Sequence, residues 1–180
     1  MDCRRTGKKF GVHVTKKQRK EVHIEYLYLD LSTCDRCVGT DAVLENVIRE
    51  LTPAFALAGY RIVYRKTEIA TAQDAVNHRF VSSPTIRVNG TDICRQVKES
   101  DCGCCGQISG TQVDCRVFVY NGKDYTIPPR EMLAEAILKN ALSPKENRAA
   151  DAYKLPDNLK KFFAGKEKKK AACCGGGSCC

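Results

Sequence analysis

The chain has 180 residues, of which 43% are hydrophobic and 12 are cysteines, and this length is enough to bury one core. It contains neither an apolar signal segment nor a run long enough to span a membrane, which argues against membrane association and predicts a cytoplasmic protein. Its net charge of +9 comes from residues 1–21 (+6) and 143–180 (+5), whereas residues 22–142 carry −2, so nucleic acid is not an expected partner.

The charge distribution and the hydrophobic pattern divide the chain into three parts. We expect residues 1–21 to form a basic mobile arm and residues 22–142 to fold as one domain. Residues 143–180 are expected to form a charged tail that carries terminal cysteine pairs. Within this tail, residues 155–163 have the spacing of an amphipathic helix.

The domain begins with a strand and a helix. Val22–Leu31 alternates at first and is then hydrophobic on both faces, which is typical of a central strand covered on both sides. Hydrophobic residues at helical spacing follow, and Thr40 or Asp41 is predicted to cap this helix. Pro53 is expected to kink the helix and Gly59 to end it.

Two Asn-Gly dipeptides mark the second half of the domain. Residues 60–69 are predicted to form a strand, and residues 71–77 a short helix. Asn89-Gly90 and Asn121-Gly122 each lie between strand-like segments, which is the strongest short-range signal for a β-hairpin. Pro128-Pro129 then opens a last amphipathic helix.

These elements predict an α/β fold in the order β-α-β-α-β-β-α. The first crossover must join parallel strands, whereas the later hairpin must be antiparallel. This is the thioredoxin-like arrangement, in which a cysteine-rich loop and a β-hairpin (residues 95–127) are inserted before the last helix.

A Cys-x-x-Cys pair, Cys34 and Cys37, lies where the first strand meets its helix. Such a pair beside a β-α-β pattern indicates redox chemistry, with Cys34 attacking and Cys37 resolving. We expect Arg36 to favour the Cys34 thiolate and Asp35 to oppose it. Pro84 opens the third strand and is similar to the cis-proline that faces the dithiol in thioredoxin-like proteins.

A second group of cysteines lies in a glycine-rich segment and in the strand after it: Cys102, Cys104, Cys105 and Cys115. Thiolates at this spacing can bind Zn²⁺, Cu(I) or As(III), with an iron–sulfur cluster less favoured. The Cys-x-Cys-Cys run is not the spacing of a zinc ribbon, so it does not identify the metal. A local disulfide is the alternative. A sharper hypothesis is that this loop folds over the Cys34/Cys37 pair and forms one multi-thiolate site.

The chain ends with two vicinal pairs separated by a flexible spacer: Cys173, Cys174, Cys179 and Cys180. Mobile vicinal thiols can capture a soft ion and pass it on by ligand exchange, or they can relay electrons to the domain. A solvated tail with incidental cysteines is the plainer interpretation.

Three segments together resemble a prokaryotic thioredoxin-like family known as domain of unknown function 2703. They are Thr33–Cys37, Ser83–Gly90, and Cys102–Cys105 with Asp114–Arg116, and the resemblance covers about residues 22–142. It implies the fold but brings no established activity, so the function must come from the residues.

Two functions are compatible with these cysteines. The first is binding or transfer of a soft metal or metalloid through thiolates, which uses all three cysteine groups. The second is a thiol–disulfide oxidoreductase or a thiol-dependent reductase that uses Cys34 and Cys37, with Pro84 beside them and a redox protein as partner. Whether the protein is an enzyme stays open at this point.

Overall fold

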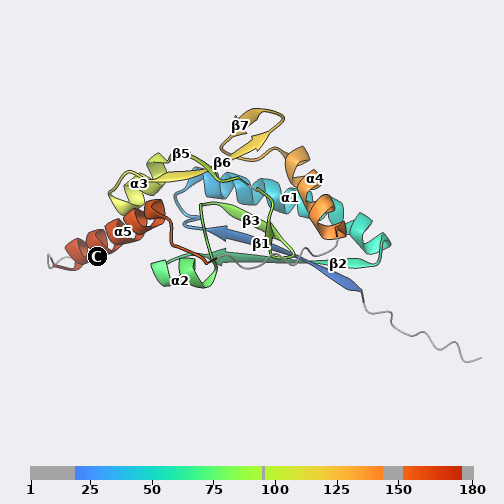
Figure 1. Ribbon diagram of the computed structural model, residues 1–180, viewed down its shortest axis with the longest axis horizontal. Helices are drawn as coiled ribbons and strands as arrows, with labels where there is room; N and C mark the ends of the chain where they lie inside the picture. The colour runs from blue at the N-terminus through green and yellow to red at the C-terminus, as the bar shows by residue number, and fades with distance from the viewer. Residues whose placement is uncertain (1–18, 95, 144–151, 176–180) are drawn as a thin grey trace, which may run out of the picture.

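The computed structural model describes residues 19–94, 96–143 and 152–175 of the chain. It has a mixed α/β fold with two sheets, which agrees with the predicted class (Figure 1). The strands are β1 (Lys20–Tyr28), β2 (Tyr60–Glu68), β3 (Thr85–Val88), β4 (Thr91–Asp92), β5 (Lys98–Asp101), β6 (Asp114–Tyr120) and β7 (Lys123–Tyr125). The helices are α1 (Asp35–Leu57), α2 (Ala72–Asn77), α3 (Gly103–Ser109), α4 (Arg130–Leu142) and α5 (Asp157–Gly175).

The larger sheet has four strands in the order β2-β1-β3-β4. The parallel pair β1 and β2 is joined through α1, as a crossover connection requires, while β3 runs antiparallel to both β1 and β4. Asn89 and Gly90 close the β3–β4 hairpin with φ values of 52° and 82°, which is the left-handed conformation of a tight hairpin turn. This predicted hairpin is confirmed.

The second sheet, β5-β6-β7, is built by the inserted segment. The Asn121-Gly122 hairpin between β6 and β7 is confirmed. The expectation of a cysteine-rich loop is wrong in part, because residues 103–109 form helix α3 and the strand before it pairs with β6. A seven-residue helix has little stability of its own and depends on tertiary packing, here against α5.

Helix α1 begins earlier than the expected caps at Thr40 and Asp41. Its first residue is Asp35 and its N-cap is Cys34, so the Cys37 side chain lies in the first turn of the helix. Gly39 therefore lies inside the helix, where the Ile127 side chain packs so closely that an added Cβ would clash with it. This close contact explains why a glycine stands inside the helix, where its presence would otherwise indicate that the helix starts later.

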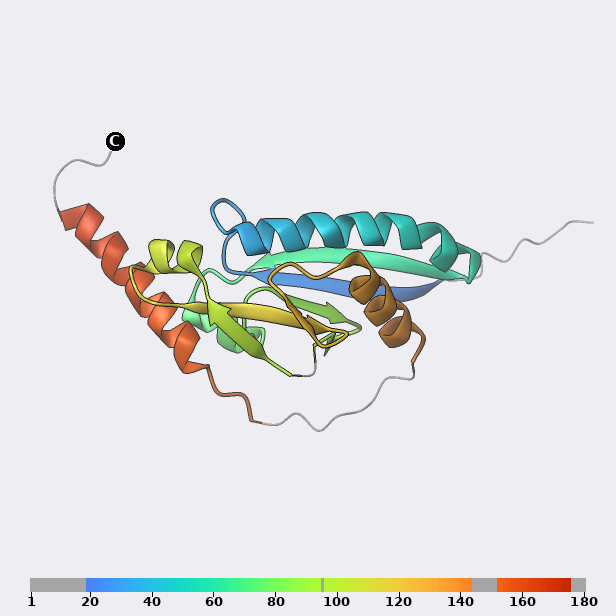
Figure 2. The same cartoon turned by 90° about the horizontal axis from the view of Figure 1, so that it is seen from above.

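The buried side chains form two clusters. One fills the space between the larger sheet and helices α1 and α4, and includes Ile24, Leu44, Val88 and Leu133. The other lies at the end of the molecule where α3 and α5 run side by side, and it contains five cysteines (Figure 2). The α1 helix contributes to both clusters, because Cys34 and Cys37 lie at its start.

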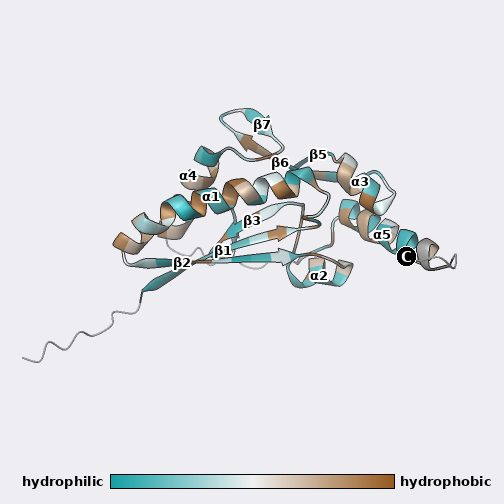
Figure 3. Ribbon diagram, turned by 180° about the vertical axis from the view of Figure 1, so that it is seen from behind, coloured by the Kyte–Doolittle hydropathy of each residue, from teal (hydrophilic) through white to brown (hydrophobic). Residues whose placement is uncertain are grey.

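Helix α5 packs on the cysteine-containing cluster. Leu159, Phe162 and Phe163 are buried there, although α5 also carries many hydrophilic residues (Figure 3). The Asn158 side chain accepts a hydrogen bond from the Asp114 amide at 3.0 Å and donates one to the Asp114 carbonyl at 2.6 Å. The helix expected over residues 155–163 is confirmed and is longer than expected, while the division into arm, domain and tail stays a prediction.

None of the helices in the described parts of the chain combines the length and the apolar character that a membrane crossing requires.

Candidate metal centre

Two Cys-x-x-Cys pairs meet at the N-termini of two helices. Cys34 is the N-cap of α1 and Cys102 is the N-cap of α3, and both have extended backbone angles. Cys37 and Cys105 lie three residues further on, in the first turn of each helix. The pair Cys102 and Cys105 has the Cys-x-x-Cys spacing, but reading Cys102–Cys105 as a single Cys-x-Cys-Cys motif overlooks it.

Four buried sulfur atoms lie together at this junction. The Sγ atoms of Cys34, Cys102 and Cys105 are all within 4.8 Å of one another, and Cys34 and Cys105 are separated by 4.0 Å. The Cys115 Sγ from strand β6 lies 3.2 Å from that of Cys105. None of the four residues is more than 3% exposed. Three members of the second cysteine group, Cys102, Cys105 and Cys115, thus lie next to Cys34. That the group and the Cys34/Cys37 pair form one multi-thiolate site stays a prediction.

The remaining two cysteines of the domain groups lie outside the set of three within 4.8 Å, although the Cys37 thiol still forms a hydrogen bond with that of Cys34. The Cys37 Sγ is 3.4 Å from the Ser83 hydroxyl, and Ser83 forms a cis peptide bond with Pro84. Cys104 is half-buried, and its Sγ lies 3.9 Å from a carboxylate oxygen of Asp35.

The terminal cysteines cannot be placed at the site. Cys173 and Cys174 lie in the last turns of α5, but their side chains fall outside the described part of the structure. Cys179 and Cys180 lie outside the described residues altogether. Their role stays a prediction.

Neighbouring thiols control the ionisation of the four clustered cysteines. Hydrogen bonds from Cys102, then from Cys105 and Cys115, strongly lower the pKa of the Cys34 thiol. Hydrogen bonds from Cys105 and Cys115 lower the pKa of Cys102 to about 7. The hydrogen bond with Cys102, together with the one with Cys34 and burial, raises the pKa of Cys105 and Cys115 above the ordinary value. Hydrogen bonds from neighbouring thiols thus favour the ionised form of Cys34.

Arg36, which lies between Cys34 and Cys37 in the sequence, makes contacts that its position in the motif did not predict. Its guanidinium donates to the backbone carbonyls of Ser100 (3.3 Å), Asp101 (2.5 Å) and Cys115 (3.2 Å). Arg36 thus ties the start of α1 to strands β5 and β6. The expectation that it favours the Cys34 thiolate stays a prediction, and the largest influences on the pKa of Cys34 come from other thiols.

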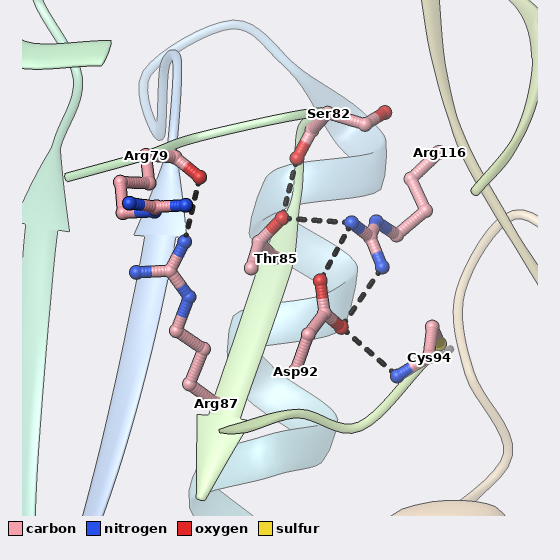
Figure 4. A network of polar contacts seen from close by, with 7 residues as sticks. All are labelled: Arg79, Ser82, Thr85, Arg87, Asp92, Cys94 and Arg116. Carbon is pink, nitrogen blue, oxygen red and sulfur yellow. Dashed lines mark hydrogen bonds and ion pairs between the residues drawn. The ribbon is translucent and has the colours of Figure 1, made fainter. Parts of the chain in front are cut away.

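A buried ion pair anchors strand β6 through Arg116, the residue that directly follows Cys115 (Figure 4). Arg116 is fully buried and donates to both carboxylate oxygens of Asp92, at 3.0 and 2.9 Å, and to the Thr85 hydroxyl at 3.1 Å. The Arg116 amide also donates to the Ser83 carbonyl at 2.7 Å. These bonds hold strand β6, and with it Cys115, next to Ser83, the residue that contacts Cys37.

Comparison with known proteins places these cysteines in a family. Residues 22–137 match the model of a family described as a domain of unknown function (DUF2703). The chain belongs to this family. No curated protein and no solved structure matches the chain. The matched DUF2703 region contains the four clustered cysteines, whereas α5 lies beyond it.

The surroundings of the DUF2703 thiols are apolar. Val113, Phe80 and Ile69 share a cluster with them, and α5 adds the side chains that close it from outside the matched region. The result is a site in which water has little access to the sulfur atoms.

The arrangement suits one soft ion. In a tetrahedral Zn²⁺ site with bonds of about 2.3 Å, neighbouring sulfur atoms lie about 3.8 Å apart. The separations of 4.0 Å for Cys34 and Cys105 and 3.2 Å for Cys105 and Cys115 are close to this value. Cys34, Cys102 and Cys105 can therefore reach a common ion with small shifts.

Proposed function

We propose that this protein binds a soft metal or metalloid ion through the thiolates of Cys34, Cys102 and Cys105, with Cys115 beside them. The observation that carries the proposal is the convergence of three buried sulfur atoms within 4.8 Å. Zn²⁺, Cu(I) and As(III) are the candidate ions, because soft ions prefer sulfur ligands.

We also propose that the larger sheet is thioredoxin-like. The element order β1-α1-β2-α2-β3-β4, followed later by α4, supports this arrangement. The parallel β1–β2 pair and the antiparallel β3 agree with it as well. On this basis Cys34 occupies the corner at which such folds carry their dithiol.

Transfer of the ion is the second part of the proposal. Helix α5 packs beside α3 and leads towards the terminal cysteine pairs, which would accept the ion from the buried site or deliver it. Removing residues 173–180 is then expected to slow transfer to an acceptor chelator and to leave the affinity of the buried site unchanged.

The experiment is an anaerobic titration of the reduced full chain, with Cys173, Cys174, Cys179 and Cys180 changed to Ser so that only the domain thiols respond. We expect about one ion per chain to bind tightly. Cys34→Ser should abolish this binding. Cys94→Ser is the matched control, because Cys94 is half-buried and outside the cluster. Equal binding by both variants would overturn the proposal.

A thiol–disulfide oxidoreductase is the second candidate. The Cys34-x-x-Cys37 spacing at the start of α1 and the contact between Cys37 and Ser83 favour it. An attacking thiol must be accessible, however, and Cys34 is fully buried. In a disulfide-reduction assay this candidate requires that Cys37→Ser abolish turnover, whereas the metal proposal expects Cys37→Ser to leave ion binding intact.

A further inference from the structure

The hydrogen bonds that the structure shows at the four clustered sulfur atoms come from other thiols and not from a lysine or an arginine. Arg36 and Arg116 are the arginines nearest in sequence to the clustered cysteines. Arg36 donates to three backbone carbonyls, and Arg116 is paired with Asp92. The wall formed by Leu159, Phe162 and Phe163 is apolar. Because these surroundings are apolar, an ion complex of low net charge is favoured at this place.

The candidate ions differ in the charge of the complex that they form. Three thiolates around Zn²⁺ give a complex of charge −1, and four give −2. Three thiolates around Cu(I) also give −2. Three thiolates around a trivalent metalloid give a neutral complex. A buried charge without a partner is strongly disfavoured, whereas a neutral complex carries no such penalty.

We propose that the site selects trivalent metalloids of the As(III) type over Zn²⁺ and Cu(I). This inference rests on the proposed function and names its substrate class. Cys34, Cys102 and Cys105 supply the three ligands that such an element requires, because their sulfur atoms are mutually within reach.

The binding step balances without an oxidant, a reductant or a base. Arsenous acid, As(OH)₃, reacts with three thiols to give one trithiolate and three water molecules. Three As–O bonds and three S–H bonds break, while three As–S bonds and three O–H bonds form. The thiol protons leave as part of the water, and a thiol that is already ionised takes up one proton from solvent in the exchange.

Cys115 has a different role in this scheme. Its Sγ lies 3.2 Å from that of Cys105, so it is placed as a fourth ligand for a tetrahedral ion. A trivalent metalloid is saturated by three sulfur ligands and leaves Cys115 as a free thiol. The dependence of binding on Cys115 therefore separates the two classes of ion.

The test is a competition between arsenite, Zn²⁺ and Cu(I) in the full chain with its four terminal cysteines changed to Ser. We expect arsenite to displace both metals, and X-ray absorption to show three sulfur neighbours around arsenic. Cys115→Ser should change arsenite affinity by less than about threefold, whereas Cys102→Ser should weaken it by more than about 100-fold. Circular dichroism confirms that each variant is folded.

Two results would overturn the inference while leaving the proposed function intact. One is retention of Zn²⁺ or Cu(I) at the cluster in the presence of equimolar arsenite. The other is loss of arsenite binding in Cys115→Ser. The proposed function itself fails only if none of the three probes binds in a manner that depends on Cys34.

Discussion

Arg36 shows how a residue of the Cys-x-x-Cys motif serves the site without touching an ion. Its half-buried guanidinium bridges α1 to Ser100, Asp101 and Cys115. Hydrogen bonds from a charged donor are stronger than neutral ones, and a guanidinium can serve several acceptors at once. Arg36 is therefore a positioning residue that holds the second cysteine group over the first.

Replacing Arg36 tests this positioning role. Arg36→Gln should lower the free energy of unfolding by about 1–3 kcal/mol, because charge-assisted bonds to carbonyls are lost. Ion affinity should fall by about tenfold, equivalent to about 1.4 kcal/mol, because the ligand groups are less well held.

Arg49→Gln on the same helix is the matched control. Arg49 is exposed, and the hydrogen bond that the structure shows for its side chain goes to the nearby Asn46. Denaturant titration and ion competition measure both effects. Unchanged ion affinity in Arg36→Gln would remove the positioning role.

Residue types at the site were predictable, but their partners were not. Six cysteines of the domain were expected as ligands, and spacing alone could not separate Cys37 and Cys104 from the four that converge. That separation depends on Ser83 and Asp35, which reach the thiols only through tertiary structure. The carbonyl partners of Arg36 are equally distant in sequence.

Helix α5 is the element that completes the wall of the site. Its buried residues pack against a cluster formed by segments that precede it by more than 35 residues, such as strand β6. Gly165 lies so close to the Ser109 carbonyl that any side chain there would clash. This close approach of α5 and α3 keeps solvent away from the thiols.

Leu159→Ala tests the contribution of α5. Leu159 is 1% exposed, so the cavity left by this change should cost about 2–5 kcal/mol of unfolding free energy. The thiols should also react faster with a bulky disulfide reagent. Leu57→Ala should change stability by no more than about 0.5 kcal/mol, because Leu57 is 91% exposed. Equal thiol reactivity in the two variants would show that α5 does not shield the site.

Elements with strong local signals were predicted well, and those that depend on packing were not. Both Asn-Gly hairpins are encoded by residues that accept a positive φ. Helix α3 has no such signal, because its Gly-Cys-Cys-Gly segment is a poor helix former and is held by distant contacts. The close contact between Gly39 and Ile127, which leaves little room for a side chain at position 39, is likewise absent from any local pattern.

At the scale of the whole molecule, the thiol site is part of the core rather than an attachment to it. The clustered cysteines belong to the same packed group as Leu27 and Phe80. An ion that cross-links Cys34 with Cys102 and Cys105 would join two segments of the chain that are far apart in sequence. Ligand binding and folding are therefore coupled.

Ion binding should raise the thermal stability of the protein. At an arsenite concentration 100 times the dissociation constant, mass action contributes about 2.7 kcal/mol. For a chain of this size that corresponds to a rise in Tm of about 5–10 °C. Thermal unfolding followed by circular dichroism measures the shift. The shift should be absent in Cys34→Ser and present in Cys94→Ser, and a shift in both would mean that the ion acts elsewhere.

The side chain of Asn158 covers part of an open strand edge, which bears on aggregation of the chain. Strand β7 pairs with β6 only at residues 118–120, so β6 has an open edge near Asp114. The amide group of Asn158 satisfies both the N–H and the carbonyl of Asp114, as a neighbouring strand would. A chain that has lost α5 therefore exposes an unpaired strand edge beside an apolar patch, which is a template for aggregation. The helix that packs on the thiol cluster thus also covers this edge of strand β6.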